Sequence, residues 1–217
     1  MVRVPVPGVV KTRMAPALSP DQACELYRAF LGDLFERLAS TRVAPTVFYS
    51  GEPASELAPL LPRPWPLVAQ ADGDLGTRMV SAFSHLLGVP GARAVLIGSD
   101  SPDLPLPYLK RAVQHLKHRD VVIGPAMDGG YYLVGLRAPS ARIFEGISWG
   151  EPTVLEQTID AIRREGLTLS MLPPWYDVDD AASLQVLRAL CEARRIGGGV
   201  RLRRTEAQLA RLIPRQG

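Results

Sequence analysis

Segments with the patterns of helices and of strands alternate along almost the whole of this 217-residue chain. The first helix pattern begins at 19-SPDQ-22, which has the residues of a capping box, and continues with apolar residues at helical spacing to about Leu38. Strands are then expected at 45–51, from 67, and at 94–98, 120–126, 131–136 and 167–172, with further helices ending near 87 and covering about 105–118, 152–165 and 181–195. This alternation predicts an α/β fold, a three-layer α/β/α sandwich with a mostly parallel sheet.

The composition is that of a globular protein. The hydrophobic share of 47% is enough for a sizeable core, and we expect one domain over residues 1–196 with a Gly-rich break and a basic tail over 197–217. No apolar run approaches the ~18 residues of a membrane-spanning helix, and the prolines of residues 1–16 argue against a signal peptide. Cys24 and Cys191 have no partner at metal-ligand spacing and are expected to be buried free thiols. The chain is therefore expected to be cytoplasmic and to have no membrane partner.

The charge of the chain gives little support for nucleic-acid binding. The formal net charge is only +3, although the sequence pI is about 9.1. Much of the positive excess falls late in the chain, a pattern typical of a solvated surface, at Arg194, Arg195, Arg201, Arg203, Arg204, Arg211 and Arg215. We therefore expect no nucleic-acid partner, and we expect the functional cations to be the few that face a phosphate.

The stretch 5-PVPGVVKTRMAP-16 places Gly8, Lys11 and Arg13 within six residues, ahead of the first predicted helix. Two cations on an irregular backbone beside a helix N-terminus can form a phosphate-binding loop. The stretch is not a P-loop, because Val10 rather than glycine precedes Lys11. On the local pattern alone, a surface turn with basic residues is the more frequent interpretation.

Two further glycine-containing loops follow predicted strands. In 73-GDLGTRM-79, Gly73 and Gly76 would let the backbone approach a ligand closely, and Arg78 lies one turn into a helix. A plain turn is an equal alternative for this loop. In 128-DGGYYLVGL-136, Asp128 and two glycines open the backbone beside the expected site, and Tyr131 could stack on a ligand or be an ordinary strand aromatic.

Two acidic stretches lie at the ends of predicted strands. In 94-AVLIGSDSPDLP-105, Asp100 suits a metal ligand, because ligands bind beyond the carboxyl ends of parallel strands and Mg²⁺ takes one or two carboxylates plus phosphate oxygens. Asp103 lies shortly before the next helix and is interpreted mainly as a helix-capping residue. In 177-DVDD-180, Asp180 is the natural N-cap of the last long helix, which leaves Asp177 or Asp179 for a metal.

Together and in this order, the stretches PVPGVVKTRMAP, GDLGTRM, GSDSPDLP, GPAMDGGYYLVGL and YDVDDAASL resemble a bacterial family of uncharacterised proteins of the DUF2064 type. The resemblance runs from about residue 4 to about residue 190. That family is described as nucleotide-diphospho-sugar transferases, or as glycosyltransferases associated with arsenosugar biosynthesis, and the resemblance implies their glycosyltransferase-A fold. The wider superfamily includes the molybdenum cofactor guanylyltransferases and the 2-phospholactate guanylyltransferases.

The resemblance implies a role for each matching residue. Asp100 matches the metal-binding acid of the Asp-x-Pro strand end in the guanylyltransferases, and Asp179 matches the late Asp or Asn that completes a site for Mg²⁺ or Mn²⁺. Asp128 would face the acceptor or the sugar as a candidate base, with Lys11 and Arg13 as catalytic cations. The implied nucleotide-binding residues are Pro7, Gly8, Lys11, Thr12, Arg13, Gly73, Asp74, Gly76 and Arg78. Secondary candidates are Asp103, Asp177, Gly129, Gly130 and Tyr131.

The activity expected is metal-dependent transfer from a nucleotide-activated sugar to a small-molecule acceptor. Nucleotidyl transfer to a phosphorylated small molecule is the first alternative, because the same carboxylates and cations would serve both reactions. The second is a non-catalytic nucleotide-binding protein, since only four residues precede Pro5 where members of the family begin with a full apolar strand. The sequence does not specify the donor base, the acceptor, the stereochemical outcome or the oligomeric state.

Overall fold

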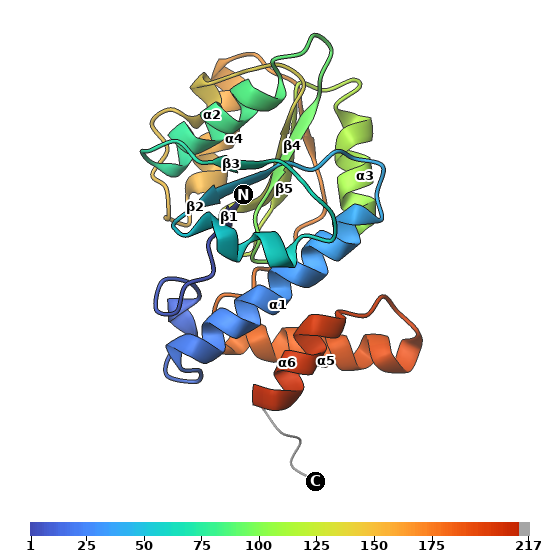
Figure 1. The fold of residues 1–217 in the computed structure, drawn as a ribbon. Helices are drawn as coiled ribbons and strands as arrows, with labels where there is room; N and C mark the ends of the chain where they lie inside the picture. Colours follow the sequence, from blue (N-terminus) through green and yellow to red (C-terminus); the bar gives the residue numbers. More distant parts are fainter. Residues whose placement is uncertain (213–217) are drawn as a thin grey trace. The chain divides into compact units, whose positions relative to one another are not determined.

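The computed structural model describes residues 1–212 (Figure 1). These residues divide into two compact units. We call Met1, 69–98 and 104–177 the central unit, and 2–68, 99–103 and the chain from 178 onward the terminal unit. The chain passes between the units several times, so neither is one contiguous stretch of sequence. The expectation of a single domain over residues 1–196 stays a prediction.

The central unit contains a four-stranded sheet, which the apolar runs of the sequence predict. Its strands are β4 (Ala94–Ile97), β5 (Val121–Pro125), β6 (Tyr131–Leu136) and β7 (Leu169–Met171), in the order β4-β6-β5-β7. β5 pairs in parallel with β7, and β6 runs antiparallel to both β4 and β5. Val121, Val122 and Ile123 of β5 are fully buried, as expected for an apolar strand covered on both faces.

Amphipathic helices supply the rest of the central core. They are α2 (Leu75–Leu86), α3 (Leu106–His115) and α4 (Val154–Arg164), with a short 3₁₀ turn, η4 (Arg142–Phe144). Phe83 of α2 stacks on Phe144 of η4 with ring centroids 5.9 Å apart. Each helix buries apolar positions that recur every three or four residues and exposes most of its charged ones, which is the pattern from which it was predicted.

The terminal unit contains the short N-terminal strand. β1 (Val2–Arg3) pairs in parallel with β2 (Val47–Ser50), and β2 is followed in the sheet by β3 (Leu67–Ala69), whose first two residues belong to this unit. Val4 continues the pairing, because its amide donates to the carbonyl of Ser50 at 2.8 Å. Val2 and Val4 are buried. The brief apolar start is thus anchored in a sheet, ahead of the loop that carries Lys11.

Helix α1 (Pro20–Ala39) begins as the sequence predicts. The hydroxyl of Ser19 accepts from the Gln22 amide at 3.2 Å, and the Gln22 side chain accepts from the Ser19 amide at 2.9 Å, which completes the capping box. Two 3₁₀ turns, η2 (Ala54–Glu56) and η3 (Ala58–Leu60), follow β2 along the chain. The buried stripe of α1 includes Leu26, Tyr27 and Phe30.

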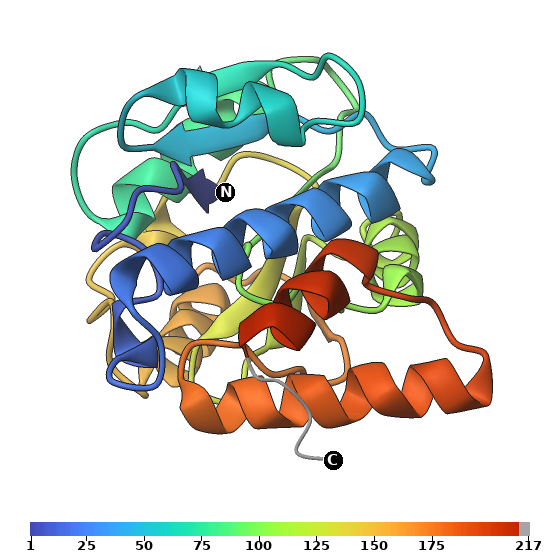
Figure 2. The ribbon, with the colours of Figure 1, turned by 60° about the horizontal axis from the view of Figure 1, so that its bottom comes forward.

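The C-terminal region is more structured than a break and a basic tail. Helix α5 (Ala181–Gly197) ends at Gly198, whose φ of 73° is left-handed, and α6 (Arg203–Leu212) then packs against α1 and α5 (Figure 2). Buried Asp33 of α1 accepts from the amides of Arg204 and Thr205 at 3.1 and 2.8 Å. A carboxylate at the first turn of a helix stabilises the orphan amides there. Residues 213–217 of the predicted tail lie outside the described residues.

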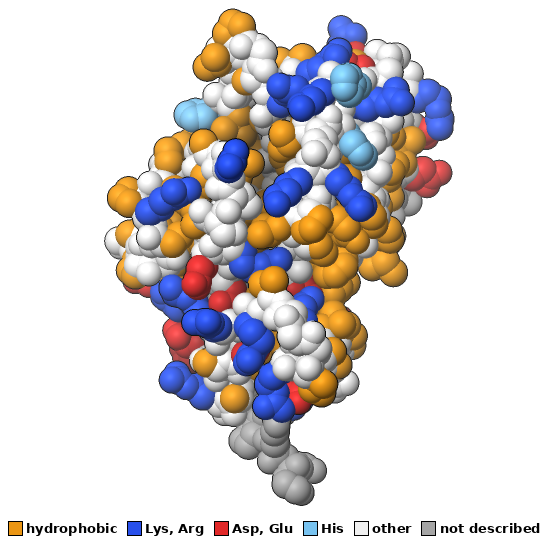
Figure 3. All heavy atoms as spheres, turned by 90° about the vertical axis from the view of Figure 1, so that its right-hand side faces the viewer, with side chains coloured by type: hydrophobic (Ala, Val, Ile, Leu, Met, Phe, Trp, Pro, Cys, Tyr) orange, Lys and Arg blue, Asp and Glu red, His pale blue; other side chains and the backbone are white. Residues whose placement is uncertain are grey.

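The fold class predicted from the alternation is confirmed: helices and strands alternate, and parallel pairing occurs in β1·β2 and in β5·β7. In the described part of the chain, no helix is both long and apolar enough to cross a bilayer. On the face in Figure 3, Lys and Arg side chains are interspersed with apolar and neutral atoms rather than gathered into one basic surface.

Candidate functional site

Two cations and two carboxylates of the terminal unit meet in one cluster. The Lys11 ammonium donates to Oδ1 of Asp179 at 2.8 Å and also bonds to Oδ1 of Asp100. Arg13 binds the other carboxylate oxygen of Asp179. We call Lys11, Arg13, Asp100 and Asp179 the four-charge cluster. The sequence predicted each of them for one site, and the structure brings them together.

The loop before α1 aims Lys11 at the acids. Gly8 has a φ of 76°, and Lys11 has a φ of 52°, which makes it the sole non-glycine residue with a positive φ between residues 1 and 212. That left-handed residue starts the 3₁₀ turn η1 (Thr12–Met14), and buried Met14 fixes the turn. The Lys11 side chain is only 3% exposed, whereas that of Arg13 is 71% exposed. Lys11 is therefore an interior cation and Arg13 a surface one.

Aromatic rings of α1 lie under the Lys11 ammonium. Its nitrogen is 5.7 Å from the ring centroid of Tyr27 and 5.8 Å from that of Phe30, within the range of a cation–π contact. Tyr27 is fixed by its own hydroxyl, which bonds to the Ser99 hydroxyl at 2.7 Å and accepts from the Arg3 amide at 3.2 Å. Burial, reinforced by the charge of Asp100, raises the pKa of Tyr27. The phenol therefore stays protonated, and its role here is to position neighbours.

The backbone holds the two acids in register. The amide of Val178 donates to the carbonyl of Asp100 at 2.8 Å, which joins the segment after β4 to the segment before α5. The amide of Asp179 donates to Ser183 Oγ at 3.0 Å. Asp180 and Ser183 form a capping box at the start of α5, so the N-cap predicted at Asp180 is confirmed. The side chains of Asp100 and Asp179 are 44% and 27% exposed, so both can reach a ligand from solvent.

Asp100 and Asp179 are the residues of the cluster that could hold a divalent cation together with a phosphate. Two carboxylates converge on one positively charged atom, and two is the number that Mg²⁺ commonly takes when substrate phosphates supply further oxygens. Within residues 1–212, no group of three or more His, Cys, Asp or Glu side chains could hold a metal ion. An all-protein metal cage is thus not built into the described part of the chain.

Asp103 does not cap a helix, so that interpretation is wrong. The N-cap of α3 is Pro105, without a side-chain hydrogen bond. Asp103 instead lies in the terminal unit, where its Oδ2 accepts from Arg194 of α5 at 2.6 Å. The Asp103 side chain is 1% exposed. A buried cation outweighs the exposed helix start as a partner, because an unpaired carboxylate in the interior is far more costly than a missing cap.

The predicted residues of the 70s loop lie in the central unit. Asp74 is the N-cap of α2: its carboxylate accepts from the amide and hydroxyl of Thr77, both at 2.8 Å, and these bonds lower the pKa of Asp74. Arg78 donates back to the carbonyl of Gly73 at 3.0 Å. A β-carbon on Gly76 would lie 2.8 Å from the carbonyl oxygen of Phe144, so this glycine has a packing reason that the sequence did not reveal.

The second glycine loop also lies in the central unit, as does Asp177. Asp128 Oδ1 accepts from the amide of Gly130 at 3.0 Å, so the acid shapes its own turn. Gly129 has a φ of 92°, and a β-carbon there would overlap the carbonyl of Pro152. Tyr131 packs edge-on against the ring of Trp149 at 6.4 Å. The predicted site residues are thus divided between the units, and their proposed roles stay predictions.

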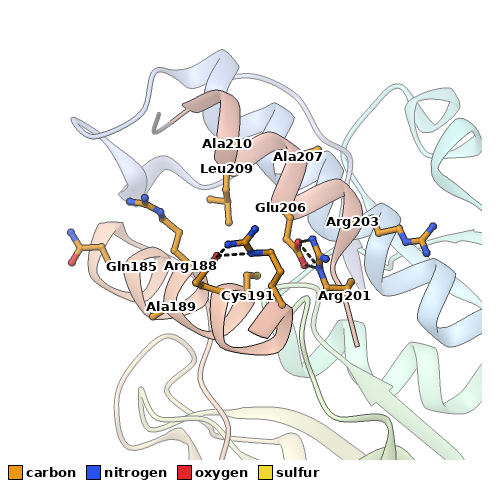
Figure 4. Close-up of a pocket in the computed structure, with 12 residues that line it drawn as sticks. Gln185, Arg188, Ala189, Cys191, Arg201, Arg203, Glu206, Ala207, Leu209 and Ala210 are labelled. Carbon is orange, nitrogen blue, oxygen red and sulfur yellow. Dashed lines mark hydrogen bonds and ion pairs between the residues drawn. The ribbon is translucent and has the colours of Figure 1, made fainter. Parts of the chain in front are cut away.

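A separate groove of about 1000 Å³ lies between α5 and α6 in the terminal unit (Figure 4). Four of its charged side chains form two pairs: Arg195 bonds to Glu192 at 2.6 Å, and Arg201 Nε bonds to Glu206 at 2.7 Å. Burial raises the pKa of Cys191 to about 11, so the thiol on its wall is protonated and unreactive near neutral pH. We place the candidate site at the four-charge cluster, because the cluster joins residues that the sequence predicted for one site.

Comparisons with known proteins bear on the family and the fold of the chain. A family model described as "Uncharacterized protein conserved in bacteria (DUF2064)" matches residues 34–151, more than half of the 217 residues. A crystal structure of a provisionally named nucleotide-diphospho-sugar transferase from Desulfovibrio desulfuricans G20 is 35% identical, with a TM-score of 0.85 over 96% of this chain and 91% of that one. The chain therefore has the fold of the nucleotide-diphospho-sugar transferases, as the resemblance implied.

One more distant relative and one structural neighbour complete the comparison. The 2-phospho-L-lactate guanylyltransferase of Methanothermobacter thermautotrophicus is 29% identical over 177 residues, which is 80% of this chain and 76% of that protein. A CMP:2-keto-3-deoxy-manno-octonic acid synthetase in complex with CTP has a TM-score of 0.52 at 12% identity, over 76% of this chain and 88% of that one. The second likeness shows the fold alone.

Proposed function

The chain belongs to the DUF2064 family, and we propose that it is a divalent-metal-dependent transferase that uses a nucleotide-activated sugar as donor. The observation that carries this proposal is the four-charge cluster, in which Lys11 and Arg13 meet two partly exposed carboxylates. Cations beside metal-binding acids are what a leaving diphosphate requires. The 35% identity to a protein named for nucleotide-diphospho-sugar transfer supports the choice of donor.

In this proposal Asp100 and Asp179 hold Mg²⁺ or Mn²⁺. Bound there, the metal would neutralise charge on the donor diphosphate and make the nucleoside diphosphate a better leaving group. Lys11 and Arg13 would hold the diphosphate by charge-assisted hydrogen bonds. The exposed loop residues Pro7 and Gly8 precede Lys11 on the same loop and would line the phosphates. The gain in rate would come from positioning and from fixed charges that require no reorganisation.

Glycosyl transfer then needs a base for the acceptor. The acceptor oxygen would form a bond to the anomeric carbon while the bond from that carbon to the diphosphate oxygen breaks. The nucleoside diphosphate leaves with the electron pair, and the hydroxyl proton passes to a carboxylate. Asp128 is the predicted base. Its Oδ1 is engaged with the Gly130 amide, which leaves Oδ2 for the proton.

Nucleotidyl transfer is the second candidate, and one observation favours it. The guanylyltransferase relative is 29% identical over 80% of this chain. In that reaction a phosphate of the acceptor would attack the α-phosphorus of a nucleoside triphosphate, and pyrophosphate would leave. The same four charges would stabilise the pyrophosphate, so the two candidates differ in their products and not in the residues of the cluster.

Thermal shifts followed by product analysis would test the proposal. UDP-sugars, GDP-sugars and nucleoside triphosphates would each be added with and without Mn²⁺, to the natural chain and to Asp100→Asn and Asp179→Asn. Stabilisation by a nucleotide-sugar with Mn²⁺, lost in both variants, supports the proposal. Stabilisation by triphosphate alone, with pyrophosphate as the product of turnover, supports the second candidate. If no nucleotide stabilises the natural chain, both are wrong.

A further inference from the structure

We propose that Lys11 is a built-in counter-ion that keeps divalent metal off the Asp100–Asp179 pair until the donor's phosphates arrive. The cluster contains two cations and two carboxylates, so its formal charge sums to zero. The ammonium of Lys11 touches both carboxylates and occupies the position between them. A divalent ion that used both acids would have to share that position with a like charge.

The surroundings of Lys11 make this arrangement persistent. Its side chain is 3% exposed and its ammonium lies over the rings of Tyr27 and Phe30, which favour a cation. The left-handed backbone at Lys11 points the side chain inward from the start of η1. A metal ion would displace a mobile surface lysine from the carboxylates easily. A buried lysine stays bonded to them unless another anion competes for its ammonium.

The donor would supply that competing anion, and this step rests on the proposed function. A diphosphate brings about two negative charges to a cluster of zero net charge, which matches the two positive charges of one Mg²⁺ or Mn²⁺. Lys11 could then turn part of its hydrogen bonding to phosphate oxygens while the metal joins the acids. Metal and donor are thus expected to bind together, each tightening the other by the same factor.

The exclusion itself can be tested with Mn²⁺ as the sole added ligand. Calorimetric titration, or the loss of the free Mn²⁺ electron-spin resonance signal, would give the affinity without any turnover. Lys11→Met removes the charge and leaves the cluster at −1, so Mn²⁺ should bind about tenfold more tightly or better than to the natural chain. Lys11→Arg keeps the charge and should show no such gain. Lys110→Met makes the same substitution at an exposed position of α3 and should behave as the natural chain.

A double variant locates the effect. Lys11→Met combined with Asp100→Asn should lose the added Mn²⁺ affinity, because one of the two acids is gone. If Lys11→Met does not fold, Lys11→Gln, whose neutral amide can still bond to the acids, carries the same expectation. Equal Mn²⁺ affinity in the natural chain and in a folded, neutral Lys11 variant would overturn the proposal. If the neutral Lys11 variants bind Mn²⁺ more tightly but no nucleotide stabilises the natural chain, the exclusion of metal by Lys11 is supported and only the proposed function is refuted.

Discussion

The buried pair of Asp103 and Arg194 makes a strong prediction about stability. Asp103 has a side-chain exposure of 1% and Arg194 one of 22%, and their bond is 2.6 Å long. Removing one partner of such a pair leaves an uncompensated interior charge, which costs about 3–5 kcal/mol. In a protein of this size, that loss lowers the melting temperature by roughly 6–20 °C. Asp103→Asn should therefore lower the free energy of unfolding and the melting temperature by about these amounts, as measured by urea and thermal unfolding followed by circular dichroism.

Matched variants separate the buried pair from ordinary surface electrostatics. Asp160→Asn removes an exposed partner of Arg163, since those two side chains are 54% and 74% exposed, and should cost about 0.5 kcal/mol or less. Replacing both buried partners, with Asp103→Leu and Arg194→Met, should cost less than Asp103→Asn alone, because the charge of Arg194 is removed together with that of its partner. A free energy of unfolding of Asp103→Asn within about 1 kcal/mol of that of the natural chain would refute the reasoning.

The same variant tests whether Asp103 belongs to the metal site. Its carboxylate is buried and committed to Arg194. A folded Asp103→Asn protein should therefore keep any thermal shift that Mn²⁺ and donor produce together, whereas Asp100→Asn should lose it. Loss of the shift in Asp103→Asn at a temperature where the variant is still folded would make Asp103 a ligand.

Two further predictions concern packing and pH. Gly76→Ala should cost about 1–3 kcal/mol in thermal unfolding, because its methyl group would lie 2.8 Å from the Phe144 carbonyl, whereas Gly197→Ala, with open space around it, should cost nothing and serves as control. Arg201 lowers the pKa of Glu206 below its ordinary value of 4.5. A lowered folded pKa means that the stabilisation is complete above pH 4.5 and is lost as the pH falls through the folded value. Glu206→Gln should therefore melt lower than the natural chain near pH 7, and the two curves should converge at low pH.

The four-charge cluster was accessible to sequence reasoning because its members occupy positions with a general meaning. Asp100 follows a buried strand and Asp179 immediately precedes a helix N-cap, and ligands collect beyond strand ends in α/β folds. Lys11 and Arg13 flank the start of a helical turn after a left-handed glycine. The sequence did not indicate that Lys11 is buried and bonded to both acids. The aromatic rings that lie near its ammonium belong to Tyr27 and Phe30 of α1, whose pattern in the sequence is that of ordinary apolar core.

Pairings over long sequence separations were beyond the local patterns. Asp103 and Arg194 are 91 residues apart in the sequence, so the local pattern indicated only the nearby helix start as a partner for the acid. The first turn of helix α6 is bonded to Asp33, which lies 171 residues before Arg204 in the sequence. Without knowledge of that contact, the many arginines of α6 resemble a solvated tail. Gly76 and Gly129 looked like openings for a ligand, while their neighbours Phe144 and Pro152 give them a steric explanation.

The backbone bond from Val178 to Asp100 has a consequence for how this site can change. It sets the spacing of the two acidic positions through main-chain atoms, so the spacing does not depend on which side chains stand there. Substitutions at either position can alter charge or reach while the scaffold keeps its geometry. A cluster of this design is open to evolutionary retuning, in which a different preferred ion or donor arises from one side-chain exchange and not from a new arrangement of the chain.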